Sequence, residues 1–210
     1  MSETEAVKAA TLELIKSLQQ RQYLNGFYLV GGTAMAVYYN HRVSIDIDLF
    51  SNFDFDANHL LENIQQDYSY QLHSTAENTL KGRINDINVD IIAHRYPYIH
   101  DPKVVDDIYL LSIPDIIAMK LNAISISGQR AKDFVDIYYT LGEYSISEMI
   151  KFYQKKYSQE NSAHVLKSLI YFDDVNPTNW PIMIEDSNLE WSKVKSKIEK
   201  EVLEYIKNNR

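Results

Sequence analysis

The chain contains no cysteine among its 210 residues. Disulfides, thiol nucleophiles and thiolate metal sites are therefore excluded. No apolar run approaches the roughly 20 residues that a membrane-spanning helix needs. With 45% hydrophobic and 24% charged residues, the composition is typical of a folded globular protein. We therefore expect a soluble, cytoplasmic protein that does not contact a membrane.

Positive charge is also in short supply. The formal net charge is -8 at pH 7, which argues against broad, nonspecific nucleic-acid binding, because such binding depends on Lys and Arg. Two local concentrations of lysine, at 151–156 and 193–200, are interpreted as solvated helix faces in preference to an RNA-contact surface. The six histidines show no metal-ligand spacing, so a zinc site is not expected.

Two aspartates two positions apart are the most informative feature of the sequence. Asp46 and Asp48 fall in a stretch, Ser44–Phe50, whose alternation predicts a half-buried strand with both acids on one face. Acidic residues are depleted in strands, so a pair of them indicates a function. Two carboxylates this close need a positive charge between them, and oxygen ligands suit Mg²⁺ or the similar Mn²⁺.

A glycine pair precedes these acids. Gly31 and Gly32 separate a predicted short strand, Phe27–Val30, from a predicted helix over Ala34–Tyr39 that Thr33 would cap. Between a strand and a helix, such a pair is a candidate phosphate cradle, because its backbone N–H groups are available to an anion.

A third acid lies farther along the chain. Asp90 falls in the middle of a predicted strand, Ile87–Ala93, which a tight turn at Asn85–Asp86 would join to another strand, Thr79–Ile84. If the Asp90 strand neighbours the first acidic strand, the three carboxylates could surround one or two Mg²⁺ ions. That arrangement serves metal-assisted chemistry on a nucleoside triphosphate.

A second concentration of charge follows in the helical part. Lys120 lies in an otherwise apolar helix, where its charge needs a partner, either a triphosphate or an acid. Lys132, Asp133 and Asp136 fall within one helical turn, and the pair Lys132–Asp136 has the spacing of an ordinary surface salt bridge. Arg42 is either a phosphate ligand or the partner of an aspartate.

The predicted fold class is α+β: a mixed sheet flanked by helices to about residue 100, followed by a helical lobe over residues 101–210. Turn and cap signals predict helices that begin at Asp56 or Asn58 and at Ser112, and a break at Gly128. Further predicted helices cover Ala131–Leu141, a segment that begins near Ser147, Ser162–Tyr171 and Leu189–Ile206.

Together the motifs resemble the nucleotidyltransferase-like AbiEii/AbiGii toxin family, part of the DNA polymerase β-type nucleotidyltransferase superfamily. The resemblance runs in order from about residue 27 to 142, and no motif aligns beyond it. It rests on five segments: Tyr28–Ala36, His41–Phe50, Asn88–Ile91, Met119–Ile124 and Arg130–Tyr138.

The resemblance implies a nucleotidyltransferase core and a helical lobe that closes over a cleft. The triphosphate would be held by Gly31, Gly32 and Thr33. Superfamily relatives carry Ser where this chain has Thr33, which keeps the hydroxyl. Asp46 and Asp48 would bind Mg²⁺ with Asp90 as the third acid, and the remaining candidate nucleotide contacts are Arg42, Ser44, Lys120, Lys132 and Asp133.

The favoured hypothesis is Mg²⁺-dependent transfer of a nucleoside monophosphate from an NTP to a hydroxyl of RNA, tRNA included, or of protein. The resemblance also implies a toxin paired with a separate antitoxin. One alternative is a two-metal nuclease, which would use the same acids but need no triphosphate cradle. The other is a non-catalytic, nucleotide-binding interaction module.

Overall fold

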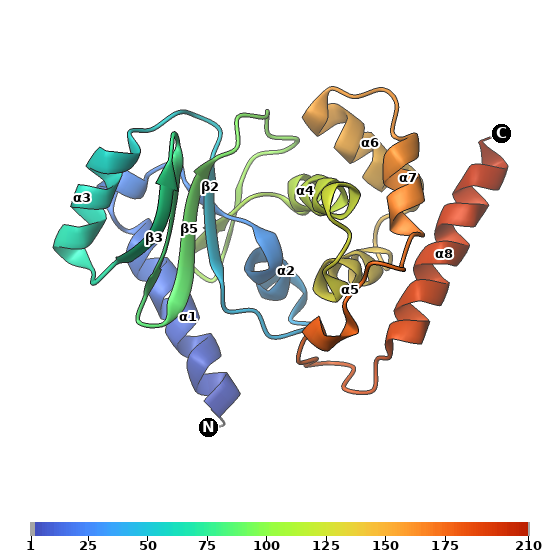
Figure 1. Cartoon of the computed structure of the whole chain (residues 1–210), viewed down its shortest axis with the longest axis horizontal. Helices are drawn as coiled ribbons and strands as arrows, with labels where there is room; N and C mark the ends of the chain where they lie inside the picture. The colour runs from blue at the N-terminus through green and yellow to red at the C-terminus, as the bar shows by residue number, and fades with distance from the viewer. Residues whose placement is uncertain (1–2, 210) are drawn as a thin grey trace. The chain divides into compact units, whose positions relative to one another are not determined.

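The computed structural model describes residues 3–209, which form two compact units (Figure 1). The first unit consists of the chain up to Val37 together with Ser44–Leu111. The second consists of Tyr38–Val43 and the chain from Ser112 onward. The predicted α+β fold class is confirmed. The first unit extends past residue 100, where the sequence analysis placed the boundary, and a short excursion of the chain belongs to the second.

The first unit is built from a mixed sheet and three helices. Its helices are α1 (Glu3–Gln19), α2 (Gly31–Tyr39, whose end enters the second unit) and α3 (Ala57–Asp67), with a short 3₁₀ turn at Gln22–Leu24. Its strands are β1 (Tyr28–Leu29), β2 (Ile47–Ser51), β3 (Gln71–Ala76), β4 (Thr79–Ile84), β5 (Ile87–Ala93), β6 (Lys103–Val105) and β7 (Ile108–Leu110).

The seven strands follow the order β3-β4-β5-β2-β1-β7-β6. The β2·β5 and β1·β7 pairs are parallel, and the other pairs are antiparallel. Helix α1 packs against β7, and α3 packs against β4. Of the two predicted helix starts, Asp56 is the one that caps α3, because its carboxylate accepts hydrogen bonds from the backbone N–H groups of Asn58 and His59.

Side chains alternate between two environments along the central strands. Ile47 and Leu49 of β2 and Val89 and Ile91 of β5 are fully or almost fully buried, and they lie opposite each other in register. The alternate positions on these strands are partly or fully exposed. Burial of such side chains stabilises the fold by about 1.5–3 kcal/mol each, so the apolar face fixes which residues lie on the other one.

The acidic strand is shorter than predicted. It begins at Ile47, so Ser44 and Asp46 lie in the extended segment before β2. Ile45, which the alternation placed on the apolar face, has 37% of its surface exposed. Because no neighbouring strand pairs with Ser44–Asp46 in the sheet register, alternation alone predicted the strand three residues too long.

Two short strands were not predicted. β6 and β7 form a hairpin whose turn is Asp106–Asp107, with φ angles of 49° and 64°. The same left-handed conformation occurs at Asn85–Asp86, with φ angles of 48° and 66°. That turn joins β4 to β5 as the sequence analysis predicted. Asn and Asp tolerate positive φ better than other non-glycine residues, so both turns fit two-residue hairpins.

The second unit is helical. Its helices are α4 (Ile113–Ile126), α5 (Ala131–Thr140), α6 (Ile146–Tyr157), α7 (Ala163–Leu169) and α8 (Trp191–Asn208), with a 3₁₀ turn at Pro177–Asn179. As predicted, Ser112 caps α4 and a break follows at Gly128, whose φ is 57°. α6 begins at Ile146, with Ser145 and Glu148 forming a capping box. None of the helices within residues 3–209 is long and apolar enough to cross a membrane.

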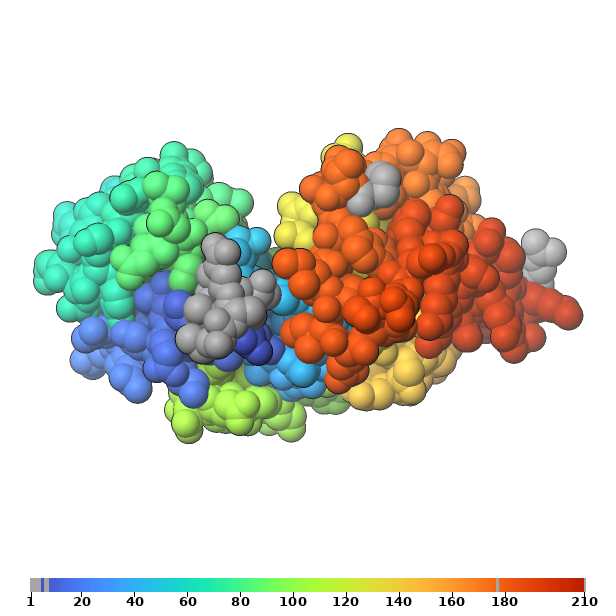
Figure 2. Space-filling view, turned by 90° about the horizontal axis from the view of Figure 1, so that it is seen from below, coloured from blue at the N-terminus to red at the C-terminus, as the bar shows by residue number. Residues whose placement is uncertain are grey.

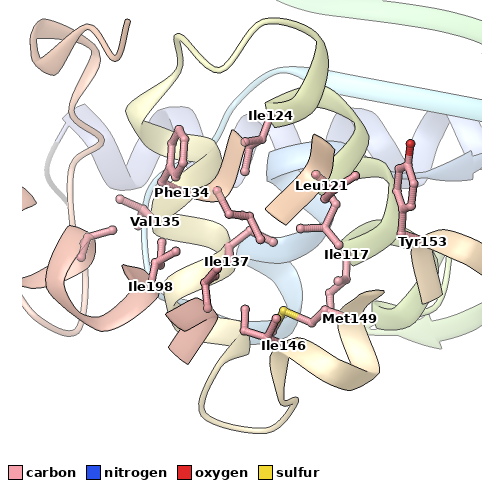
Figure 3. Packing of buried hydrophobic residues seen from close by; sticks show 14 of the residues in the cluster. Ile117, Leu121, Ile124, Phe134, Val135, Ile137, Ile146, Met149, Tyr153 and Ile198 are labelled. Atoms are coloured by element: carbon pink, nitrogen blue, oxygen red, sulfur yellow. The ribbon is translucent and has the colours of Figure 1, made fainter. Parts of the chain in front are cut away.

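One apolar core holds these helices together (Figure 3). Ile117 and Leu121 from α4, Phe134 from α5, Met149 from α6 and Ile198 from α8 all have 0% of their surface exposed. In the space-filling view, α8 and the segment before it form much of the visible surface of this unit (Figure 2). Lys193 and Lys200 on this helix are exposed and Lys195 and Lys197 are partly exposed, in agreement with the interpretation from the sequence. In the other lysine group, Lys151 and Lys155 are exposed, but Lys156 is buried, so the predicted solvated face is wrong for that residue.

A buried ion pair crosses the same unit. The Lys156 Nζ atom on α6 lies 2.8 Å from the Asp115 Oδ1 atom in the first turn of α4, and both side chains are 0% exposed. Ser112 donates a hydrogen bond of 2.5 Å to the other oxygen of Asp115. Removing one member of such a pair leaves an uncompensated charge in the core.

We therefore expect Lys156→Met to lower the free energy of unfolding by about 3–5 kcal/mol, because the Asp115 carboxylate would lose its buried counter-charge. Urea denaturation followed by circular dichroism measures the change. Lys155→Met is the matched control, since Lys155 is exposed on the same helix. Equal stability of the two variants would contradict a structural role for the Lys156–Asp115 pair.

Candidate active site

Two of the predicted acids are neighbours in the sheet. Asp48 on β2 lies opposite Asp90 on β5 in the parallel register. Neither position belongs to the buried set of its strand, and 26% of the Asp90 side chain is exposed. The sheet thus brings together two acids that lie 42 positions apart in the sequence.

Asp46 lies just before β2, beside the first residues of β5. The Asn88 Nδ2 atom donates a 2.9 Å hydrogen bond to the Asp46 Oδ1 atom, and Asn88 is two positions before Asp90 on β5. Residues two apart on a strand share a face. Asn88 and Asp90 therefore lie on one face of β5. Asp46 lies beside Asn88, and Asp48 lies beside Asp90.

The glycine pair lies directly beside these acids. Gly31 follows β1 and has a φ of 71°, and the Val30 N–H donates a 2.9 Å hydrogen bond to the Asp48 carbonyl. A Cβ atom at Gly31 would overlap the Asp48 Oδ2 atom and lie 3.3 Å from its Cγ. Both the positive φ and this close approach require glycine. Gly31 and Gly32 open helix α2, as the predicted cradle requires.

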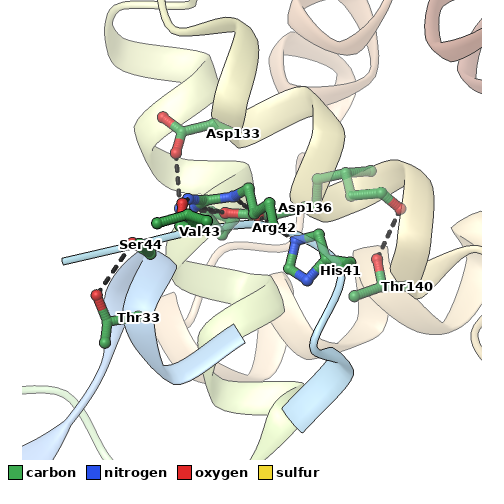
Figure 4. Close-up of polar contacts among 10 residues, drawn as sticks. Thr33, His41, Arg42, Val43, Ser44, Asp133, Asp136 and Thr140 are labelled. Carbon is green, nitrogen blue, oxygen red and sulfur yellow. Dashed lines mark hydrogen bonds and ion pairs between the residues drawn. The ribbon is translucent and has the colours of Figure 1, made fainter. Parts of the chain in front are cut away.

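Thr33 and Ser44 fix the segment that carries the first acid. The Thr33 hydroxyl donates a 2.5 Å hydrogen bond to the Asp46 carbonyl and lies 3.0 Å from the Ser44 Oγ atom (Figure 4). Thr33 is 2% exposed and belongs to the first turns of α2, so it does not cap the helix as predicted. Its hydroxyl binds the backbone beside Asp46, and a contact with a triphosphate stays a prediction.

The three acids meet the requirements of a hard divalent cation only in part. Their donor atoms are carboxylate oxygens, which suit Mg²⁺. Asp48 and Asp90 lie on adjacent strands, and Asp46 lies just before β2. Within residues 3–209, however, no three acidic or histidine side chains converge closely enough to hold a metal ion. Two of the carboxylates accept contacts from other side chains, Asp46 from Asn88 and Asp90 from Lys81, whose Nζ atom is 3.2 Å from Asp90 Oδ2.

A second polar cluster, centred on Asp136, lies in the second unit (Figure 4). Arg42 binds Asp136 with two hydrogen bonds, of 2.7 Å from Nε and 2.9 Å from Nη2. The Lys120 Nζ atom lies 2.7 Å from Asp136 Oδ2 and 2.7 Å from Asp133 Oδ1. The His41 Nε2 atom lies 2.8 Å from Asp136 Oδ1. We refer to these five residues as the Asp136 cluster.

Charge pairing in the Asp136 cluster outweighs the cost of burial. Burial alone would raise the pKa of Asp136, but the charges of Lys120 and Arg42, with hydrogen bonds from His41 and Arg42, bring that pKa well below its usual range. Burial alone would lower the pKa of Lys120, but the charges of Asp133 and Asp136 raise it. The Asp136 carboxylate and the Lys120 ammonium thus keep their charges at neutral pH.

The predicted residues therefore divide between the two units. The first unit holds Gly31, Gly32, Thr33, Ser44, Asp46, Asp48 and Asp90. Arg42 and Lys120 form ion pairs with aspartate, one of the two alternatives drawn from the sequence for each. Asp136 pairs with these two cations, whereas the sequence spacing suggested a salt bridge with Lys132. Nucleotide contacts by Arg42, Lys120, Lys132 and Asp133 stay predictions.

Three residues in these clusters had no assigned role. Lys81 could have been found, because a two-residue turn at Asn85–Asp86 sets the hairpin register that places Lys81 opposite Asp90. Asn88 could have been found from its spacing to Asp90. The contact of His41 with Asp136 joins residues 95 positions apart, and no local pattern indicates it.

Comparison with known proteins places the chain. Residues 13–204 match a family described as nucleotidyl transferase AbiEii toxin of type IV toxin–antitoxin systems. This chain belongs to the AbiEii family. The resemblance found in five segments is thereby confirmed and extended to most of the chain, and the prediction of a nucleotidyltransferase enzyme is confirmed with it.

Relatives of this AbiEii protein span nearly its full length. An uncharacterised protein of Aquifex aeolicus is 28% identical over 208 residues, which cover 96% of this chain and 98% of the relative. The structure of MenT4, a nucleotidyltransferase toxin of Mycobacterium tuberculosis, has a TM-score of 0.60 at 12% identity and covers 97% and 90% of the two chains. JHP933 of Helicobacter pylori has a TM-score of 0.53 at 16% identity and covers 99% and 97%. The two structures show a shared fold.

We predict that Gly31→Ala lowers nucleotidyl transfer about 100-fold, because the new Cβ atom would displace the Asp48 carboxylate. Labelled-NTP turnover measures the loss. Gly128→Ala is the control, since Gly128 also has a positive φ and its Cβ would lie 3.3 Å from the Ile124 carbonyl, in the other unit. It should lose stability but keep activity. Full activity of Gly31→Ala would disprove the close approach to Asp48.

The Asp136 cluster gives a pH dependence of stability. The pKa of Asp136 is lower in the folded state than in the unfolded state. Ionised Asp136 therefore stabilises the fold at pH values above the ordinary pKa of an aspartate. This stabilisation disappears as the pH falls through the lower, folded-state pKa. We expect Asp136→Asn to cost about 3 kcal/mol at pH 7. The difference from the natural protein should shrink on acidification below about pH 4. Urea titrations across this range measure it, and a constant difference would refute this account.

Proposed function

We propose that this protein transfers a nucleoside monophosphate from an NTP to a hydroxyl of RNA, tRNA included, or of a protein, and releases pyrophosphate. Asp46 and Asp48 would hold Mg²⁺ or Mn²⁺, with Asp90 as the third acid. The observation that carries this proposal is the position of Asp48 and Asp90 side by side on adjacent strands next to Gly31, with Asp46 just before β2, in a chain of the AbiEii family.

The reaction is a substitution at the α-phosphorus. The acceptor oxygen forms a bond to that phosphorus, the bond from it to the bridging oxygen breaks, and the pair of electrons leaves with pyrophosphate. The hydroxyl proton passes to a carboxylate of the site. The bound cation would neutralise charge on the phosphates. The protein would lower the activation barrier mainly by positioning the NTP and the acceptor hydroxyl, and also by stabilising the charge that develops on the phosphates.

Each residue has a part in this positioning. Asp48 is held beside the glycine turn, and Asp46 is fixed through its backbone by Thr33 and through its side chain by Asn88. The N–H groups where α2 begins would face an anion, which the partial positive charge of a helix N-terminus favours. A toxin role and a separate antitoxin partner are proposed from the family.

We expect Asp46→Asn or Asp48→Asn to abolish transfer of label from α-³²P-NTP to an acceptor. Each change removes a negative oxygen ligand while keeping the shape of the side chain. The purified protein is incubated with each labelled NTP, Mg²⁺ and either total RNA or protein. Asp86→Asn is the matched control, because Asp86 lies in the β4–β5 turn with 89% of its side chain exposed.

Each outcome of this assay separates one function from another. Label in RNA or in protein identifies the acceptor, and its loss in both acidic variants supports the mechanism. Shortened RNA without incorporated label would identify a nuclease. NTP binding without transfer would identify an interaction module. Equal labelling by the natural protein and the variants would remove the acids from the mechanism.

A further inference from the structure

A lysine on the neighbouring strand contacts the third acid. Lys81 on β4 lies opposite Asp90 in the antiparallel β4·β5 register, and its Nζ atom is 3.2 Å from Asp90 Oδ2. Its side chain is 46% exposed, against 26% for Asp90. Lys81, Asp90 and Asp48 therefore form one row across three adjacent strands, on the face opposite the buried apolar residues. We refer to these three residues as the acidic row.

The next cation along β4 is directed elsewhere. Arg83 lies opposite Asn88, but its guanidinium contacts Gln71, through a 2.8 Å hydrogen bond, and Asp86, at 3.5 Å. These partners belong to β3 and to the hairpin turn. Lys81 is thus the cation that β4 supplies to the row of proposed metal ligands.

This position has an electrostatic consequence. Carboxylates on adjacent strands of one face repel each other, and a nearby ammonium reduces that repulsion. The lysine ammonium is a compact charge on a flexible side chain. It can therefore move away from a carboxylate and become hydrated at little cost. A divalent cation that binds Asp90 competes with this ammonium for the negative charge of the carboxylate.

We propose that Lys81 is a positioning residue of the acidic site. It holds the Asp90 carboxylate while no divalent cation is bound, and it competes with the cation for that carboxylate. The inference rests on the proposed function, because it takes Asp90 as the third acid. The contact with Lys81 also explains why the three carboxylates do not converge, because Lys81 holds the Asp90 carboxylate.

Mn²⁺ binding, measured by isothermal titration calorimetry without nucleotide, tests the proposal. Lys81→Met removes the charge and keeps the apolar stem, and it should bind Mn²⁺ about two- to fivefold more tightly, the range expected from the loss of one exposed ion pair. Lys81→Arg retains a cation and should bind like the natural protein. In an Asp90→Asn background, Lys81→Met should no longer change the affinity, since the contact is already absent.

Arg95→Met is the matched control for net charge. The Arg95 Nη1 atom lies 3.2 Å from Asp54 Oδ1 in the same unit, with 62% and 61% of the two side chains exposed. Like Lys81→Met, this variant loses one positive charge and one ion pair of 3.2 Å. The lost ion pair does not involve a residue of the acidic row. Its Mn²⁺ affinity should match that of the natural protein.

Thermal unfolding provides a readout independent of catalysis. With EDTA present, Lys81→Met should melt at a lower temperature than the natural protein, because the carboxylates lose their counter-charge. Saturating Mn²⁺ should remove this difference, because the cation replaces the ammonium and binding to the folded state stabilises it. A defect that persists unchanged in Mn²⁺ would indicate a purely structural role and overturn the proposal.

Failure of this inference and failure of the proposed function are distinguishable. If Mn²⁺ binds and Asp48→Asn weakens the binding, but Lys81→Met has no effect or has the same effect in the Asp90→Asn background, only the role of Lys81 is removed. If Mn²⁺ does not bind the natural protein, or binds independently of Asp46 and Asp48, both proposals fall.

Discussion

The alternation of buried and exposed side chains along β2, β4 and β5 is the constraint on which the acidic row depends. The apolar residues of these strands must share one face to leave water, so the alternate positions share the other. A slip of one residue in register would bury Asp48 and Asp90 and expose their apolar neighbours. The free energy of core burial therefore also aligns the carboxylates, although they carry no attraction for one another.

Elements with a repeated local signal could be predicted from the sequence. β4 and β5 alternate regularly on either side of a turn whose residues favour positive φ, and their predicted bounds match the structure. The equivalent signal at Asp106–Asp107 was present but flanked by only three residues on each side. Alternation also continued into Ser44–Asp46, where pairing ends. Whether a neighbouring strand lies alongside is decided by tertiary structure, which a local pattern does not contain.

The site was predictable to the extent that the partners of its charges lie on regular elements. The proximity of Asp48 and Asp90 followed from two strands that became neighbours. The partner of Lys120 could not be chosen from the sequence, because a buried ammonium requires a negative charge without specifying its source. Asp133 and Asp136 supply it, and Arg42 reaches Asp136 from 94 positions away.

The two polar clusters differ in burial, and that difference bears on what each can do. In the Asp136 cluster, charges with almost no exposed surface bind one another at 2.7–2.9 Å, so removing a partner leaves a charge without water or a counter-ion. Such a cluster strongly favours one arrangement. In the acidic row, Lys81 and Asp90 are partly solvated, and their separation costs little. Carboxylates of this second kind can exchange a side-chain partner for a dissolved cation at little cost, as the proposed function requires of Asp90.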